Sequence, residues 1–237
     1  MHIQDSFLVG KWAVAWFGAS SVFVSKGIYD IARHSRRVAM FKPMLGLLSA
    51  AVFFISLLPV PVPITGTSSH PVGTPAAAIL VGPFASMVLA VAALLLQALF
   101  FAHGGLSTLG ANVFSMGVVG SLISYLVFRT GRRIGLSLAI AAFLAGCLGD
   151  LAVYCTTSLQ LALGMPGAGG LPLTKAIQTF LILFMPTQLP LALLEGLVTA
   201  GMVTYIARVR PDILRNFGLV KGSDLKGGKQ CHIKLPY

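Results

Sequence analysis

The first two residues of the chain, Met1 and His2, carry three nitrogen atoms that can bind one metal ion together. The terminal amine and the amide nitrogen of His2 close a five-membered chelate ring. The same amide and the imidazole Nδ1 close a six-membered ring, so the three nitrogens lie nearly in a plane. An imidazole from His70 would complete a square-planar site, which suits Ni²⁺ or Cu²⁺ and accepts Co²⁺ where the protein imposes the geometry. The pattern predicts a metal site made of Met1, His2 and His70.

Simpler interpretations compete with this site. A histidine near a chain end often belongs to a frayed segment, and a loop histidine often only forms a hydrogen bond. The chain has only five histidines, so two of them on one face of the protein strengthen the metal interpretation. His34 and His232 lie among basic residues, where we expect them to be solvated.

The stretch "AHGGLSTLGAN" places two adjacent glycines, Gly104 and Gly105, between His103 and Asn112. Glycine allows positive φ angles and a close approach of the backbone to another group. This loop could cover the metal site, with His103 or Asn112 holding a ligating imidazole in place. A plain turn between two helices would explain the same residues.

Two acidic residues, Asp150 and Glu195, fall inside apolar stretches. An ionisable residue within a membrane segment suggests a function, but a hydrogen bond to Gln160, Gln188 or a threonine that packs helices explains them more simply. We expect neither acid to be a metal ligand.

The composition is that of an integral membrane protein. Only 10% of the 237 residues are charged and 56% are hydrophobic, whereas soluble domains carry about 25% charge. The 17 basic residues outnumber the 6 acidic ones, but they cluster between apolar stretches and in the tail. That distribution is typical of membrane topology rather than of nucleic-acid binding. The start lacks the basic region and cleavage site of a signal peptide.

Several apolar stretches are long enough to cross a bilayer, which takes about 20 residues in a helix. Glycine and proline interrupt the third of these stretches at Gly82-Pro83, and two prolines, Pro186 and Pro190, interrupt the last. The stretches are 8–32, 39–58, 76–102, 110–128, 135–163 and 173–208.

Charge decides how the interrupted stretches cross. The segments 33–42 and 129–133 and the tail from Arg208 are basic, whereas 60–75, 103–109 and 164–173 contain no charged residue. The positive-inside rule places the basic set in the cytoplasm. All basic segments reach that side only if a short third span (71–82) turns back at Gly82-Pro83 and 173–208 crosses once as a broken helix.

This topology predicts an all-α integral membrane protein, a bundle of about seven transmembrane helices with its N-terminus outside and its C-terminus in the cytoplasm. Residues 1–209 would form the substrate-binding transmembrane domain, and 210–237 a basic cytoplasmic tail. His2, His70 and His103 would then share the outer face.

The chain resembles the substrate-specificity (S) components of energy-coupling factor (ECF) transporters for cobalt and nickel, the CbiM/NikM family. The matching stretches follow one another over nearly the whole chain. They are "MHI" at the start, "GTSSHPVG" (66–73), "ILVGP" (79–83), "LLLQALFFAHGGLSTLGANVFSMGVVG" (94–120), "GDLAVYCTTSLQLAL" (149–163) and "TQLPLALLEGLVT" (187–199).

The resemblance implies seven transmembrane helices and an amino terminus that folds back into the outer cavity. It implies that the Met1 amine, the His2 amide and imidazole, and His70 bind the transported ion, with no resident cofactor. The implied partners are a transmembrane coupling protein, two cytoplasmic ABC ATPases and a small auxiliary membrane subunit, in the cell membrane of a prokaryote. The chain has "MHIQDS" and "SSHP" where many cobalt members have "MHIMEG" and "SCSHP", and "AHGGLSTLGAN" is closer to the cobalt group.

We therefore expect a subunit for Co²⁺ or Ni²⁺ uptake, with cobalt favoured, and not an enzyme. The chain contains no Walker A motif, so ATP hydrolysis would belong to a partner. An intramembrane enzyme using Asp150 and Glu195 is one alternative, but it needs those acids at the depth of a histidine, and the expected topology leaves Glu195 without one. A stand-alone secondary metal carrier is the other, but acidic or histidine relays are sparse.

Overall fold

The structure is a computed structural model, and it describes residues 2–8, 10–36, 41–57, 60–61, 68–101, 103–165, 170 and 172–211. Within these ranges the chain forms seven helical units and a two-stranded ribbon. The elements are α1 (Gly10–Ser35), α2 (Phe41–Ser56), β1 (Val60–Pro61), β2 (Ser68–Ser69), α3 (Thr74–Val81), α4 (Pro83–Phe100), α5 (Leu109–Asn112), the π-helix η1 (Val113–Val119), α6 (Gly120–Arg133), α7 (Leu138–Gly164) and α8 (Leu173–Val209). Elements α5, η1 and α6 follow one another without a break and count as one unit.

The helices have the composition of a membrane bundle. Four of those described are long and apolar enough to span a bilayer: Pro83–Phe100, Leu109–Arg133, Leu138–Gly164 and Leu173–Val209. Large apolar side chains such as Val14, Val22 and Leu47 point outwards and are exposed. Exposed apolar helix faces are unfavourable in water, whereas the lipid of a bilayer covers them directly. The prediction of an all-α membrane protein of about seven helices is confirmed, while the orientation of its termini stays a prediction.

The short third helix turns back where the sequence predicts. Helix α3 ends at Val81, Gly82 adopts a positive φ of 90°, and α4 begins at Pro83. All eight residues of α3 are buried. A helix too short to cross lipid therefore has its ends covered by protein, which satisfies the backbone groups that a bilayer could not.

Helix α8 is continuous, so the prediction of a broken last helix is wrong. It runs for 37 residues through Pro186 and Pro190. Each proline removes one hydrogen bond inside the helix, but packing on neighbouring helices keeps a helix intact in such places. In this chain α7 packs along α8, and a glycine in each of them, Gly146 and Gly196, allows their backbones to approach closely.

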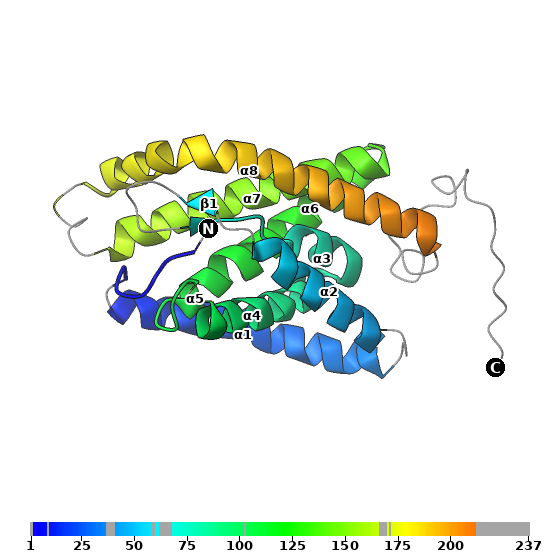
Figure 1. Cartoon of the computed structure of the whole chain (residues 1–237), viewed down its shortest axis with the longest axis horizontal. Coiled ribbons are helices and arrows are strands. Elements are labelled where there is room, and N and C mark those ends of the chain that lie inside the picture. Colours follow the sequence, from blue (N-terminus) through cyan, green and yellow to red (C-terminus); the bar gives the residue numbers. More distant parts are fainter. Residues whose placement is uncertain are drawn as a thin grey trace.

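The helices form an elongated bundle. In Figure 1, α7 and α8 run along one long side and α1 along the opposite side, with α3 and α4 between them. The C-terminal ends of α1 and α8 lie at the same end of the bundle, and both carry basic residues in their last turn. This common end agrees with the charge pattern used to predict the topology. The predicted basic tail lies outside the described residues from 212 onwards.

The segment that precedes α1 is part of the core. Ile3 is fully buried, and it packs with Leu8 against side chains of three helical units. This cluster is completed by Ala111, Tyr154, Leu161 and Phe184. Ile3 is therefore held in the interior of the bundle, and its position decides where the preceding His2 lies.

Candidate metal centre

His70 lies in a buried loop between β2 and α3. Its side chain is 1% exposed. Nδ1 lies 2.8 Å from the carbonyl oxygen of Pro71, and because a carbonyl only accepts, Nδ1 carries the proton. The Nε2 atom is therefore the one with a free lone pair, and it has no hydrogen-bond partner among the described residues. A fixed tautomer of this kind is typical of histidines that bind metals.

Helix α8 holds this loop on both sides of His70. The backbone N–H groups of Val72 and Gly73 donate to the two carboxylate oxygens of Glu195, at 2.7 and 2.9 Å. Gln188 Nε2 donates to Ser69 Oγ. The Glu195 carboxylate thus contacts the residues two and three positions after His70, and the bonds described for it do not include one to a histidine. The sequence predicted that Glu195 forms a hydrogen bond to a side chain of another helix; the bonds described for it go to backbone N–H groups of a loop.

His2 is held in the interior through the residue that follows it. The N–H of Ile3 donates to Asn112 Oδ1 at 2.8 Å, and Asn112 Nδ2 donates back to the Ile3 carbonyl oxygen at 3.0 Å. Thr108 Oγ1 donates to the same carbonyl at 2.6 Å. Asn112 thus fixes the backbone next to His2; the bonds described for it do not include one to an imidazole.

Two glycines let the N-terminal segment lie close to the loop before α5. Gly104 has a φ of +75°, and a Cβ built there would lie 2.7 Å from His2 Nδ1. A Cβ at Gly105 would lie 2.1 Å from Asp5 Oδ1. Asp5 Oδ1 accepts hydrogen bonds from the N–H and the hydroxyl of Ser107. The predicted close approach of this loop is therefore present, and its target is the N-terminal segment.

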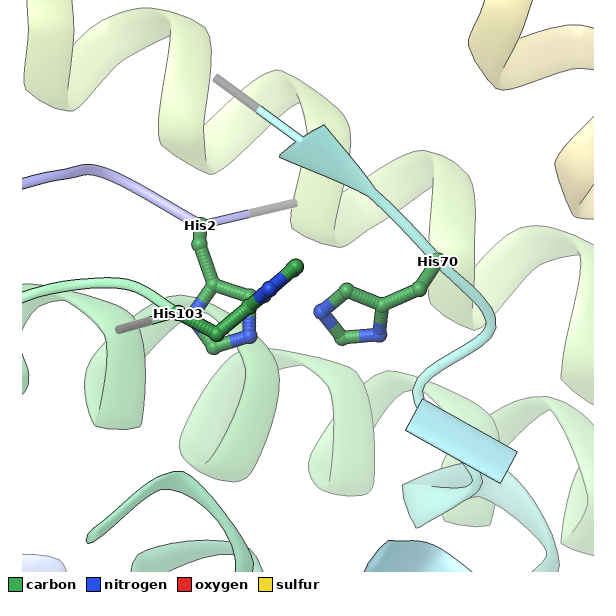
Figure 2. A group of neighbouring side chains, drawn as sticks. All are labelled: His2, His70 and His103. Atoms are coloured by element: carbon green, nitrogen blue, oxygen red, sulfur yellow. The ribbon is translucent and has the colours of Figure 1, made fainter. Parts of the chain in front are cut away.

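Three imidazoles meet where these segments converge. Figure 2 shows the rings of His2, His70 and His103 pointing towards one another from the N-terminal segment, the loop after β2 and the loop before α5. The ring centroids are 4.6 Å apart for His2 and His70, 5.1 Å for His2 and His103, and 5.7 Å for His70 and His103. One ring nitrogen of each lies within 4.8 Å of those of the other two. Such a group of nitrogens can bind Ni²⁺, Cu²⁺, Zn²⁺ or Co²⁺.

Burial keeps these imidazoles neutral. It is the main cause that lowers the pKa of His2 well below its usual value, and the neighbouring His70 lowers the pKa further. Burial likewise lowers the pKa of His70 well below its usual value, and it lowers the pKa of the half-buried His103. A histidine binds metal only in its neutral form, so this cluster is prepared for a cation.

The predicted site residues divide into three groups. His2 and His70 come together, and His103, predicted as a supporting residue, lies close enough to be a ligand itself. Asn112 lies next to the site and holds its backbone. Met1 lies outside the described residues, so the amine ligand stays a prediction. His34 lies at the end of α1, where its Nδ1 bonds the backbone oxygen of Asp30, and His232 lies outside the described residues.

Sequence reasoning missed the two residues of α8 that hold the histidine loop, Gln188 and Glu195. Their partners are more than 115 residues away in the chain. A buried acid in an apolar helix was the available signal, but it does not say which backbone groups the carboxylate binds.

The chain is similar to known transport proteins over most of its length. Residues 2–213 match the family CbiM, described as the cobalt uptake substrate-specific transmembrane region. A cobalt transport protein CbiM of Sorangium cellulosum is 46% identical over 221 residues, which are 93% of this chain and 97% of that protein. A cobalt transport protein CbiM of Geobacter sulfurreducens is 51% identical over 93% of this chain, and the chain spans 63% of that longer relative.

A crystal structure described as that of a transition metal transporter has the same fold. It superimposes with a TM-score of 0.77 at 26% identity and covers 92% of this chain and 98% of its own. A truncated transition metal transporter gives a TM-score of 0.73 over 87% of this chain. The family match extends over most of the chain and includes all three clustered histidines, His2, His70 and His103. The chain therefore belongs to the CbiM family, the substrate-specific transmembrane region of cobalt uptake.

Proposed function

We propose that this protein is the substrate-binding membrane subunit of an ECF-type ABC transporter that imports Co²⁺. The observation that carries the proposal is a pair of buried imidazoles, His2 and His70, whose rings lie 4.6 Å apart and whose Nε2 atoms have no partner among the described residues. Burying two polar nitrogen atoms costs free energy when each loses its hydrogen bonds to water and gains none from the protein. A bound cation supplies the missing interaction.

The proposed ligands are the Met1 amine, the amide and imidazole of His2, and the imidazole of His70. These four nitrogens would enclose the ion in a plane. His103 is placed to complete or cover the site from a third segment. The arrangement admits Ni²⁺ as well as Co²⁺, and we favour Co²⁺ because the named relatives are cobalt transport proteins.

Transport requires partners, because the chain contains no Walker A motif. We propose that two cytoplasmic ABC ATPases hydrolyse ATP and that a transmembrane coupling protein transmits the motion, with a small auxiliary membrane subunit assisting. The complex would lie in the cell membrane of a prokaryote. A role in supplying cobalt for cobalamin biosynthesis fits this cargo.

Metal analysis of the purified full-length protein tests the proposal. We expect one Co²⁺ per chain in the wild type, and none above background in a variant with both His2→Ala and His70→Ala. Asp150→Asn, which removes a buried carboxylate and none of the three histidines, tests the alternative site. Retention of the ion by the double histidine variant, together with its loss in the Asp150 variant, would instead favour a site built on the buried acids.

A further inference from the structure

Helix α8 presents two buried polar side chains to the loop that carries His70. Gln188 and Glu195 are 1% and 0% exposed. They are seven residues apart, which is about two turns, so they lie on the same face of α8. Their partners flank the histidine: Gln188 bonds Ser69 on one side, and Glu195 bonds Val72 and Gly73 on the other.

A carboxylate suits this position better than any other side chain. Val72 and Gly73 both present N–H donors, and an ionised carboxylate offers one acceptor oxygen to each. The two donors lie just before the N-terminus of α3, the positive end of that helix. The 2.7 and 2.9 Å distances are those of well-formed N–H···O hydrogen bonds.

The loop between these contacts leaves His70 little freedom. Gly73 has a φ of +73°, and a Cβ there would lie 3.1 Å from Val52 Cα, so the turn is closely packed. The bond from His70 Nδ1 to the Pro71 carbonyl joins the ring to the same loop. Ring, loop and α8 are therefore connected by hydrogen bonds through Pro71, Val72 and Gly73 to Glu195.

We infer that Glu195 is the positioning residue of the metal site: by binding the N–H groups of Val72 and Gly73, it fixes where His70 Nε2 lies, with Gln188 as a second attachment. This inference rests on the proposed function. A fixed His70 imposes the planar geometry that Ni²⁺ and Co²⁺ accept, whereas Zn²⁺ in protein sites is almost always tetrahedral. Glu195 thereby favours the transported ions over Zn²⁺ without touching any of them.

The Glu195→Gln variant tests the assignment. Glutamine keeps the size of the side chain but has a single acceptor oxygen, and its NH₂ group would face a backbone N–H that also donates. We expect Ni²⁺ and Co²⁺ affinity, measured by titration calorimetry of the full-length protein, to fall by about 10–100-fold, the usual effect of losing an outer partner of a ligand. We expect Zn²⁺ affinity to change less, so the Ni²⁺ to Zn²⁺ preference falls. The visible absorption band of bound Ni²⁺ should shift as its plane distorts.

Thr199→Val is the matched control. Thr199 is fully buried on α8, one turn after Glu195, and valine keeps nearly the same size. We expect its ion preference and its Ni²⁺ spectrum to match the wild type. If Glu195→Gln and Thr199→Val alter the preference equally, Glu195 acts only through general stability and the inference is wrong.

Two measurements keep the inference open to refutation if Glu195→Gln does not fold. Glu195→Asp keeps the charge but shortens the side chain by one methylene, and we expect an intermediate ion preference. Hydrogen–deuterium exchange of the wild type should show slow exchange at the Val72 and Gly73 amides; fast exchange there would overturn the anchor directly. If the wild type binds neither ion, the proposed function is refuted. If the wild type binds and the Glu195→Gln variant has the same affinities and ion preference, this inference alone is refuted.

Discussion

The two segments that bring His2 and His70 together are held in different ways. The N-terminal segment, residues 2–8, is bound by neutral side chains of one neighbouring stretch, Thr108 and Asn112, and by a contact between Asp5 and Ser107 that is open to solvent. The histidine loop, residues 68–73, is bound from inside the bundle by a buried carboxylate of α8. Both halves of the site are buried, but the N-terminal half is held mainly by neutral groups and the histidine loop by a carboxylate.

The two attachments differ in chemistry. A neutral hydrogen bond contributes about 0.5–1.5 kcal/mol to stability, and one to a charged group about 1.5–3 kcal/mol. The three bonds to Ile3 are buried and neutral, and the two bonds to the carboxylate of Asp5 are exposed. The two bonds to Glu195 reach a carboxylate and are buried as well.

The largest effect is expected from one extra residue before Met1. The amine would move one residue away from His2, so the two-ring chelate of the wild type cannot form. A chelate through the added peptide nitrogen would fill the plane and leave no position for His70, so calorimetry should show a changed affinity for Co²⁺ and Ni²⁺ that no longer depends on His70. A matched insertion of one residue into the tail after Lys226 should leave affinity unchanged. Unchanged affinity in the extended protein would show that the amine is not a ligand, and mass spectrometry of the purified chain establishes where it begins.

His70→Ala should weaken binding by about 100-fold or more, because it removes one ligand and leaves Glu195 holding a loop without a function. His34→Ala is the control, because this histidine lies at the end of α1 and bonds only a backbone oxygen among the described contacts. Calorimetry with Co²⁺ compares the two. Equal losses would contradict both the site and the predicted topology.

Gly104→Ala tests the contact between the N-terminal segment and the loop before α5. Its φ of +75° is strained for alanine, at a cost of about 1–3 kcal/mol, and the added Cβ would lie 2.7 Å from His2 Nδ1. We expect a lower thermal midpoint and a metal affinity lowered by about tenfold, the fold-change of about 1.4 kcal/mol. Gly135→Ala shares a positive φ but has open space around it, so it should lower the midpoint without affecting affinity.

The smallest effect concerns pH and the metal-free protein. The folded pKa values of His2 and His70 lie below the unfolded value of about 6.5, because burial disfavours the charged form. As the pH falls below about 6.5, these histidines take up protons in the unfolded chain but not in the folded chain. Their contribution to the free energy of unfolding therefore decreases until the pH reaches the lowered pKa of the folded state, and it is constant above about pH 6.5. Thermal midpoints in detergent between pH 8 and 5 measure this loss. His70→Gln, with one buried imidazole fewer, should show a smaller loss than the wild type.

The sequence was sufficient to predict the helices where a local signal exists. Apolar length and the distribution of basic residues predicted seven helical units, and Gly82-Pro83 correctly predicted the turn between α3 and α4. Pro186 and Pro190 led to the wrong prediction of a broken last helix. Local rules consider the hydrogen bonds that proline removes but not the packing of α8 on α7. The π-helix after Asn112 has no local sequence signal of its own.

The histidines that come together were predictable, but the residues that hold them in place were not. His2 and His70 stand out because few histidines occur in the chain and because a terminal His can close chelate rings. Gly104 and Gly105 predicted that the backbone approaches another group closely, but they did not indicate that this group is the N-terminal segment. Glu195 could not be assigned, because its bonds to Val72 and Gly73 join residues more than 120 positions apart and depend on tertiary structure alone.

Helix α8 is longer than a bilayer is thick. Its 37 residues extend over about 55 Å at 1.5 Å per residue, whereas the hydrocarbon core is about 30 Å thick. Even a tilt of about 40°, the upper end for membrane helices, accommodates only about 39 Å of helix. The remaining turns must extend among headgroups or water, so the helix that carries Gln188 and Glu195 continues beyond the hydrocarbon core.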